Sequence, residues 1–263
     1  MNRSGAKSSK REAGLTAGSI GSSAAKAPKA GLPVEAEFTG FPPALFEFLE
    51  ELADHNERPW FLQNKHRYEQ WVREPALAFI RAFRPRLAKI SQFFLASDRP
   101  VGGSLLRIYR DIRFSKDKTP YKTNVGIQFR HELGRDIHAP GFYVHLEPGE
   151  CFLALGVWRP DRQSLAAIRQ AIADDPAGWR RAVSNQQFQA IWTLEGDSLQ
   201  RPPQGFRPDH PCIEDLKRTD YIAVTDVEEA DTYRPEFVDQ VAEAFRAGRP
   251  LMHFLCKALQ LPF

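Results

Sequence analysis

The chain has 263 residues, 42% of them hydrophobic, which is enough for one sizeable core or two small ones. A mean hydropathy of −0.45 and the lack of a long apolar run exclude a transmembrane helix. The first residues lead into no apolar segment of a secretory signal, and three widely spaced cysteines fit neither a disulfide framework nor a zinc site. We therefore expect a cytoplasmic protein without a membrane partner.

The net charge of +3 is distributed unevenly. Residues 1–37 hold six cations and three acids, which accounts for all of it and leaves residues 38–263 neutral. Within this neutral part, residues 107–122 carry +4 and residues 214–239 carry −6. The sequence pI of 8.8 is therefore no sign of general nucleic-acid binding, and any electrostatic footprint is local.

Residues 1–36 are rich in Ser, Ala, Gly and Lys and have no apolar periodicity. Such a segment cannot bury enough surface to offset its ordering entropy, so we expect a disordered basic tail. Its scattered cations favour a solvating extension over an arm for nucleic acid or membrane. A single globular domain is predicted for residues 37–263.

Three helices are predicted at the start of this domain. Pro42 and Pro43 precede an i, i+3, i+4, i+7 apolar pattern that ends at Leu52. A second helix is predicted at 60–72. A third opens at Pro75, and Pro85 should kink or split it.

The apolar period then changes from helical to alternating, which is typical of strands. The segment 104–114 should begin as a strand that bends or ends near Asp111, with a loop over 113–121. Further strands are expected at 125–129, 142–146 and 151–158. The last of these is apolar on both faces, as in a central strand, and residues 148–150 form a tight hairpin before it. No helix separates these strands, so a mainly antiparallel sheet is predicted over about residues 104–158.

Helices are expected again after Pro160. Their apolar patterns cover 165–172, 177–183, 237–245 and 251–259. Four prolines predict a loop over 197–211, followed by one or two helical turns at 213–218 and a short strand at 221–224. The fold class is therefore α+β, with the sheet flanked by N-terminal and C-terminal helices.

Signatures of phosphate-binding loops, dinucleotide folds and zinc proteases are absent. His131, His138 and His145 recur every seven residues, but a metal site would need them to converge from two strands and a loop. Surface or loop histidines are the simpler interpretation, so neither a metal nor a cofactor is expected. His145 and Glu147 share a strand face.

The densest chemical feature is the basic run at residues 107–122, with six cations against two acids. Arginine's planar fork binds a carboxylate or phosphate through two parallel hydrogen bonds. We therefore expect an anion site, with a phosphate-bearing small molecule as the leading ligand. The expected ligand-binding residues are Arg107, Arg110, Arg113, Lys116, Asp117, Lys118 and Lys122.

Asp111 and Tyr121 are the first catalytic candidates in this run, if the protein is an enzyme. Asp111 would orient an arginine or act as a base, and Tyr121 would donate a hydrogen bond. Both could move protons beside an electropositive pocket. Whether the protein is an enzyme, and its oligomeric state, stay open.

A structural or interaction protein is the main alternative. The arginines would then form an internal ion-pair network with Asp111 and Asp117, completed by Glu147 or the acidic residues 214–239. Buried arginines need such partners.

The aromatic residues of the run raise a third alternative. Tyr109, Phe114 and Tyr121 alternate with the cations, as in proteins that stack single-stranded nucleic acid. Core packing for Phe114 and a local hydroxyl bond for Tyr121 are the simpler interpretation. The segment 56–68 could add site residues on one helix face, or only helix capping and an aromatic core.

The run Arg107-x-x-Arg110-Asp111-x-Arg113-Phe114-x-x-Asp117-Lys118-x-x-Tyr121 resembles the signature of a bacterial family called domain of unknown function 2461. Further similar pieces are Phe41-Pro42, Phe48-Leu49, Asn56-x-Arg58-x-Trp60-Phe61, Lys65-x-x-Tyr68 and Pro120-Tyr121-Lys122-Thr123. The resemblance covers about residues 38–259. It implies that 107–121 act as one unit, and it implies no particular activity.

Overall fold

The computed structural model describes residues 37–113, 115–134 and 138–263, which all belong to one compact unit, Glu35–Phe263. The expected tail and the side chain of Phe114 lie outside these residues. The helical elements are α1 (Pro43–Asp54), α2 (Arg58–Arg67), the π-helical η1 (Tyr68–Arg73), α3 (Glu74–Ile90), α4 (Arg162–Asp174), α5 (Pro176–Val183), α6 (Gln186–Gln189), α7 (Ile213–Lys217), α8 (Glu229–Thr232), α9 (Phe237–Ala247) and α10 (Arg249–Ala258). The strands are β1 (Val125–Arg130), β2 (Gly141–Glu147), β3 (Glu150–Val157), β4 (Thr193–Glu195) and β5 (Tyr221–Asp226).

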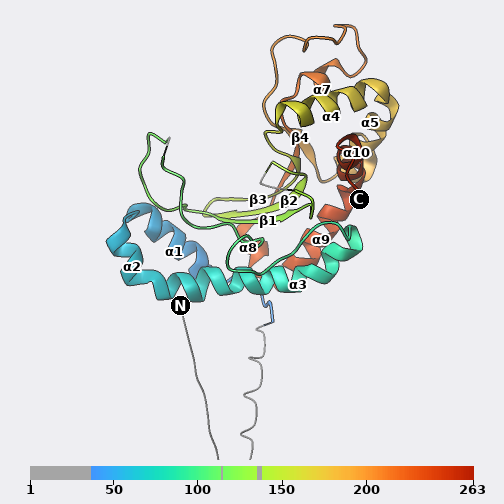
Figure 1. Cartoon of the computed structure of the whole chain (residues 1–263). Coiled ribbons are helices and arrows are strands. Elements are labelled where there is room, and N and C mark those ends of the chain that lie inside the picture. Colours follow the sequence, from blue (N-terminus) through green and yellow to red (C-terminus); the bar gives the residue numbers. More distant parts are fainter. Residues whose placement is uncertain (1–36, 114, 135–137) are drawn as a thin grey trace, which may run out of the picture. The chain divides into compact units, whose positions relative to one another are not determined.

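The strands form one antiparallel sheet in the order β1-β2-β3-β5-β4 (Figure 1). The predicted α+β class is confirmed, and β3 is the central strand, as its two apolar faces predict. β2 and β3 are joined by a tight hairpin over Pro148 and Gly149, also as predicted. The sheet extends beyond the expected residues, because β5 and the unpredicted β4 add to its far side.

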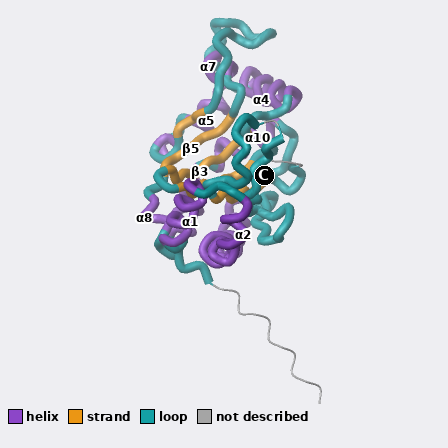
Figure 2. Tube along the Cα trace, turned by 90° about the vertical axis from the view of Figure 1, so that its left-hand side faces the viewer, coloured by secondary structure: helices purple, strands orange, loops and turns teal. Residues whose placement is uncertain are grey.

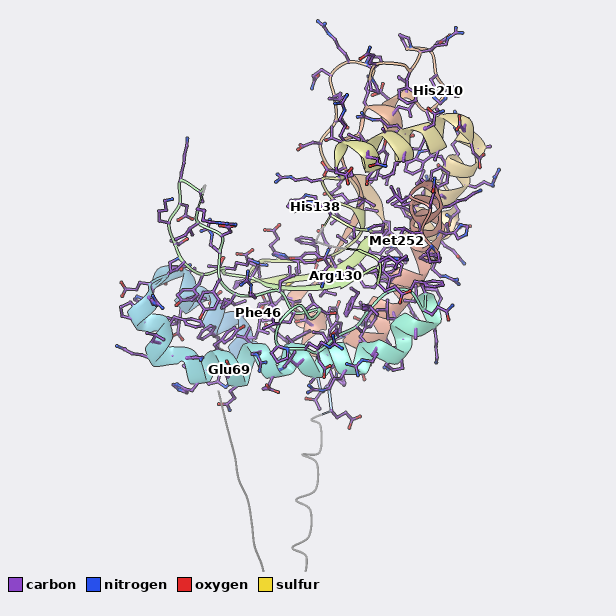
Figure 3. The ribbon with its side chains drawn as sticks, in the orientation of Figure 1. Phe46, Glu69, Arg130, His138, His210 and Met252 are labelled. Atoms are coloured by element: carbon purple, nitrogen blue, oxygen red, sulfur yellow. The ribbon has the colours of Figure 1, made fainter. Side chains whose placement is uncertain are left out.

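One face of the sheet is covered by helices α3 and α9 (Figure 1). Phe83 of α3 packs on Phe129 of β1 with ring centroids 4.7 Å apart, and Phe142 of β2 packs on Phe245 of α9 at 4.9 Å. Figure 2 shows the strands between α4 and α7 at one end and α1 and α2 at the other. Phe46 of α1 and Met252 of α10, both labelled in Figure 3, are buried in this core. Every second strand residue therefore points to the helices, and the others point to the opposite face.

Helix α3 runs through Pro85 without ending, which corrects the expectation of a split at this residue. Proline removes one backbone hydrogen bond from a helix. Contacts on both sides of it hold α3 to α9. Phe79 lies 5.8 Å from Phe237 by ring centroids, and Arg86 donates to Asp239 at 2.9 Å. Tertiary packing thus outweighs the local preference.

The strand expected to begin at Ser104 and to bend or end near Asp111 is not a continuous strand in the described part of the chain. Only two isolated bridges form there, Leu105 with Ile127 and Tyr109 with Tyr121. Between the bridges, the segment leading into β1 is two residues longer than its partner. The extra residues form a bulge that interrupts the ladder, and such bulges redirect side chains.

The remaining described residues agree with the expected helices and loop, apart from the unpredicted α6 and α8. All three cysteines are buried and free. None of the helices in the described ranges combines the length and apolarity of a membrane span.

Candidate functional site

The basic run lies in two paired segments that are joined by a tip. We call the whole of this unit, residues 104–128, the motif ribbon, and its tip is residues 111–119. The segments pair in antiparallel fashion at the base of the tip. The Arg110 amide donates to the Pro120 carbonyl at 2.9 Å, and the Lys122 amide donates to the Ile108 carbonyl at 2.7 Å. The cations are therefore presented on a short two-stranded support that continues into β1.

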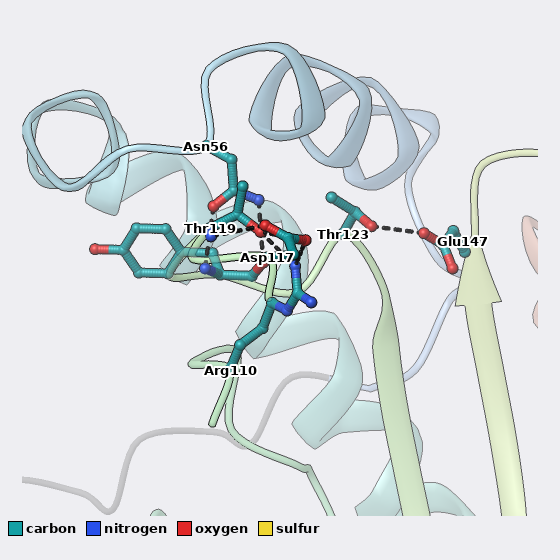
Figure 4. A network of polar contacts seen from close by, with 7 residues as sticks. Asn56, Arg110, Asp117, Thr119, Thr123 and Glu147 are labelled. Carbon is teal, nitrogen blue, oxygen red and sulfur yellow. Dashed lines mark hydrogen bonds and ion pairs between the residues drawn. The ribbon is translucent and has the colours of Figure 1, made fainter. Parts of the chain in front are cut away.

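Tyr121 fastens the base of the ribbon to the N-terminal helices. Its buried ring stacks on Phe61 of α2 at 4.1 Å between centroids. The Asn56 side chain, between α1 and α2, donates to the Tyr121 carbonyl and accepts from its amide, both at 3.0 Å (Figure 4). Burial raises the pKa of Tyr121, so its hydroxyl stays protonated and able to donate near neutral pH. The first role of this residue is structural attachment.

Arg110 is held inside the tip by its neighbours. Its guanidinium contacts the Asp117 carboxylate and the Thr119 hydroxyl (Figure 4). The Thr119 amide donates to Asp117 at 2.9 Å. The Thr119 amide and the Arg110 guanidinium lower the pKa of Asp117 to about 2. These three residues therefore form a closed polar network.

Arg113 has a carboxylate partner of its own. It donates to the two oxygens of Asp111 at 2.9 and 2.7 Å. The Arg113 side chain and amide lower the pKa of Asp111 to about 2. A carboxylate with so low a pKa is a weak base at neutral pH, so orientation of an arginine suits Asp111 better than proton abstraction. Lys118 donates to the Ile112 carbonyl at 2.9 Å.

The other four cations of the run have no ion pair of this kind. Among the described residues, Arg107, Lys116, Lys118 and Lys122 have no carboxylate within ion-pair distance, although the charge of Arg107 helps to lower the pKa of Asp111. Arg107 is exposed and Lys122 is partly buried. Burial, and then the positive charge of Arg107, lowers the pKa of the Lys122 ammonium. The backbone carries the two residues on paired segments, because the Lys122 amide donates to the carbonyl of Ile108, the residue after Arg107.

The bulge beyond Lys122 directs Thr123 and Asn124 onto the sheet face opposite α3 and α9. The Thr123 hydroxyl donates to Glu147 at 2.6 Å (Figure 4). The other Glu147 oxygen lies 3.1 Å from Nε2 of His145, and Nδ1 of His145 lies 3.1 Å from the Tyr143 hydroxyl. The Asn124 amide lies 3.4 Å from the same Nδ1. We call these five residues the sheet-face polar chain.

Packing fixes the position of the central imidazole. The His145 ring is stacked on Phe152 of β3 at 4.4 Å and 10°. On the other side, the residue paired with His145 is Gly126. A Cβ atom at Gly126 would lie 2.7 Å from the Tyr143 hydroxyl, so the absence of a side chain leaves room for this hydroxyl.

The sequence did not single out this polar chain as a site. It did indicate that His145 and Glu147 share a strand face, which is confirmed. The stronger signal would have been the spacing Tyr143-x-His145-x-Glu147, which places three polar groups on one face of a strand. No sequence pattern predicted that Thr123 and Asn124 would join the polar chain, because their positions depend on the bulge.

The other histidines of the seven-residue series have separate partners. His131 is buried, lies 2.9 Å from the Pro262 carbonyl through Nε2 and accepts from the Leu133 amide at 3.2 Å. His138 contacts the Trp158 carbonyl at 3.0 Å. Within the described ranges, no group of three or more His, Cys, Asp or Glu residues is arranged to hold a metal ion.

In the segment 56–68, Asn64 donates to the Trp60 carbonyl and accepts from Arg67, both at 3.0 Å. The ring of Tyr68 packs against Phe61 at 5.4 Å. The contacts of Asn64 and Tyr68 are thus local, and Asn56 is the polar residue of this segment that reaches the motif ribbon.

Comparison with known proteins gives the family. A family model described as "Conserved hypothetical protein (DUF2461)" matches residues 44–254. The chain belongs to the DUF2461 family. The expected family is thereby confirmed. No curated protein and no solved structure matches this DUF2461 chain.

Proposed function

We propose that this DUF2461 protein binds an anionic, phosphate-bearing ligand beside the motif ribbon. Arg107 and Lys122 are the principal cations, with Lys116 and Lys118 adding positive charge from the tip. The observation that carries the proposal is that Arg107 and Lys122 lie on paired segments and, among the described residues, have no carboxylate within ion-pair distance. Free thiols that are all buried suit a reducing compartment such as the cytoplasm.

A bound anion would lower the free energy of the folded state by offsetting the charges of Arg107 and Lys122. Two like charges at close range raise the free energy of the folded state, and burial of one of them adds to it. The lowered pKa of Lys122 reflects both effects. A phosphate between the two side chains would accept charge-assisted hydrogen bonds from both.

The seven expected ligand-binding residues then divide into three groups, one of which is the pair Lys116 and Lys118 that adds positive charge from the tip. Arg110, Arg113 and Asp117 shape the tip through their mutual contacts. Arg107 and Lys122 contact the ligand directly. The tip pairs thus support the site, and the cations at the ribbon base provide its affinity.

The test is calorimetric titration with inorganic phosphate and pyrophosphate. Arg107→Ala and Lys122→Met should each weaken binding about tenfold, the loss of one charged hydrogen bond. Arg246→Ala, which removes an exposed cation of α9, is the matched control and should bind as the wild type does. Failure of the wild type to bind either anion would contradict the proposal, as would equal binding by all four proteins.

The structural or interaction protein remains the second candidate, because Arg110 and Arg113 pair with acids of their own tip. It predicts that Arg110→Ala lowers stability and that no anion stabilises the wild type. The nucleic-acid alternative is supported by Tyr109, whose ring is 57% exposed in this cationic run and could stack on a base. It predicts binding of single-stranded oligonucleotides that weakens steeply with salt.

A further inference from the structure

One aromatic side chain at the base of the motif ribbon is open to solvent. Tyr109 is 57% exposed, whereas Tyr121, which lies opposite it in the ribbon, is 2% exposed. A single exposed ring on a protein surface needs no explanation by itself. Tyr109 differs from such a ring in two respects, the aromatic cluster that supports it and the cations beside it.

Two buried rings hold Tyr109 in place. Its ring centroid lies 5.4 Å from that of Tyr121, and it lies 6.4 Å from that of Phe61 in an edge-on contact. These contacts restrict the side chain before any ligand arrives, and a tyrosine loses little conformational entropy when it binds. Tyr109 therefore offers a supported ring surface on which a flat group can stack.

Backbone pairing brings this ring close to the cations of the ribbon base. Tyr109 and Tyr121 form an antiparallel bridge, and beside it the Lys122 amide donates to the Ile108 carbonyl at 2.7 Å. The two Cα atoms of such a bridge are about 4.5 Å apart. Lys122 directly follows Tyr121 in the chain, and Arg107 precedes Ile108. The Cα atoms of both cations therefore lie within about 8.5 Å of that of Tyr109.

We propose that the phosphate-bearing ligand of this site is a single nucleotide, with its base stacked on Tyr109 and its phosphate held by Arg107 and Lys122. The inference rests on the proposed anion site and adds the part of the ligand that cations do not recognise. Every base has a π-face, so this stack recognises a nucleotide without requiring a particular base. The long stems of the two cations let their charges meet a phosphate that a ribose separates from the base.

The number of open rings favours one nucleotide over a strand. Proteins that hold single-stranded nucleic acid provide several aromatic side chains, on which successive bases stack. Of the two aromatic side chains that the structure describes in the motif ribbon, Tyr121 is buried and Tyr109 is exposed. One stacking position accommodates one base.

The test compares adenosine 5′-monophosphate with ribose 5-phosphate by calorimetric titration. The two ligands share the phosphate and differ in the base. Wild-type protein should bind the nucleotide about 5- to 150-fold more tightly, the range for one base stacked on an aromatic side chain. Tyr109→Ala should lose this preference and keep its affinity for ribose 5-phosphate. Equal affinities of the wild type for the two ligands would overturn the proposal.

Three further variants separate stacking from other roles of the side chain. Tyr109→Phe keeps the ring and should keep the preference, which excludes a hydrogen bond of the hydroxyl as its cause. Tyr109→Leu keeps apolar cover over the buried rings, so it tests the stack even if Tyr109→Ala fails to fold. Trp158→Ala removes a 40% exposed ring from another segment and is the matched control, with the preference of the wild type.

Thermal unfolding of each variant identifies a folding defect. A purely structural role for Tyr109 would lower stability and weaken the binding of both ligands alike. Tyr109→Leu protein that folds and still prefers the nucleotide as the wild type does would overturn the stack.

The base contact and the anion site can fail separately. Wild-type protein that binds ribose 5-phosphate but gains nothing from the base would overturn the base contact and leave the anion site standing. Nucleotide binding that depends on Tyr109 but not on Arg107 or Lys122 would overturn the assigned anion site. Tighter binding of an oligoadenylate than of the mononucleotide, falling steeply with salt, would overturn the single nucleotide in favour of a strand.

Discussion

The tip of the motif ribbon and the sheet-face polar chain contain similar polar chemistry in different surroundings. In the tip, the side chains of Arg113 and Asp111 are 76% and 60% exposed. In the polar chain, the side chains of His145 and Glu147 are 12% and 30% exposed. Water therefore screens the tip pairs and competes for their hydrogen bonds, whereas the polar chain is largely shielded.

The tip has the higher density of charge, but the polar chain has the more narrowly defined geometry. Exposed ion pairs contribute little to stability, and their partners can exchange for water or a ligand. Polar groups shielded from water must keep their partners, so their geometry is defined more narrowly. The tip is thus suited to adapt to an anion, and the polar chain is suited to hold a fixed arrangement.

The largest expected effect concerns the base of the ribbon. Phe61→Ala should lower the free energy of unfolding by about 3–5 kcal/mol, because it removes the buried ring on which Tyr121 stacks. Leu62→Ala, at the neighbouring position of α2 that is 62% exposed, should change it by less than about 0.5 kcal/mol. Denaturant unfolding measures both. Equal effects of the two substitutions would show that the base is not held by this stack.

An intermediate effect is expected on the sheet face. Gly126→Ala should destabilise the protein by about 1–3 kcal/mol, because the added Cβ would lie 2.7 Å from the Tyr143 hydroxyl. In a Tyr143→Phe background the same change should cost less, since this hydroxyl is gone. A double-mutant cycle measures the coupling. Additive effects would mean that the hydroxyl does not occupy the space above Gly126.

The smallest expected effect concerns the tip at low pH. Asp111 and Asp117 have pKa values of about 2, below the value of about 3.9 for unfolded aspartate. Their contribution to the folded tip is present above about pH 4 and is lost as the pH falls toward 2. Amide exchange at Thr119, corrected for its intrinsic pH dependence, should accelerate over this interval in the wild type.

Asp117→Ala provides the control for the pH measurement. The Thr119 amide of this variant should exchange rapidly already at pH 5, because its side-chain acceptor is removed. Amides of the central strand β3 should stay protected in both proteins. Thr119 protection that persists in the wild type at pH 2 would contradict the role assigned to Asp117.

Much of the fold could be predicted, because most elements depend on local patterns. Helices α1, α9 and α10, the β2–β3 hairpin and the short strand β5 follow from apolar periodicity and turn residues. The strand expected from Ser104 failed because pairing depends on a partner far along the chain, where Thr123 and Asn124 form a bulge. The short β4 and α6 carry too few residues for a periodic signal.

The candidate site was predicted only in part. The sequence placed the cations of residues 107–122 together, and the structure separates Arg110 and Arg113, which have acid partners, from the other four, which have none among the described residues. That division depends on distances of a few ångströms within a folded ribbon, which residue type does not reveal. For the same reason, Asp111 looked like a potential base until its pairing with Arg113 lowered its pKa.

The sequence by itself determined the α+β class, the family signature and the location of the positive charge. These depend on local periodicity, composition and the order of residues along the chain. Tertiary structure alone decided which cations lack acid partners and that Thr123 meets Glu147. It also decided that the Tyr143 hydroxyl lies over a glycine. Each of these results depends on segments brought together by β pairing and core packing, so the physical reason is long-range contact.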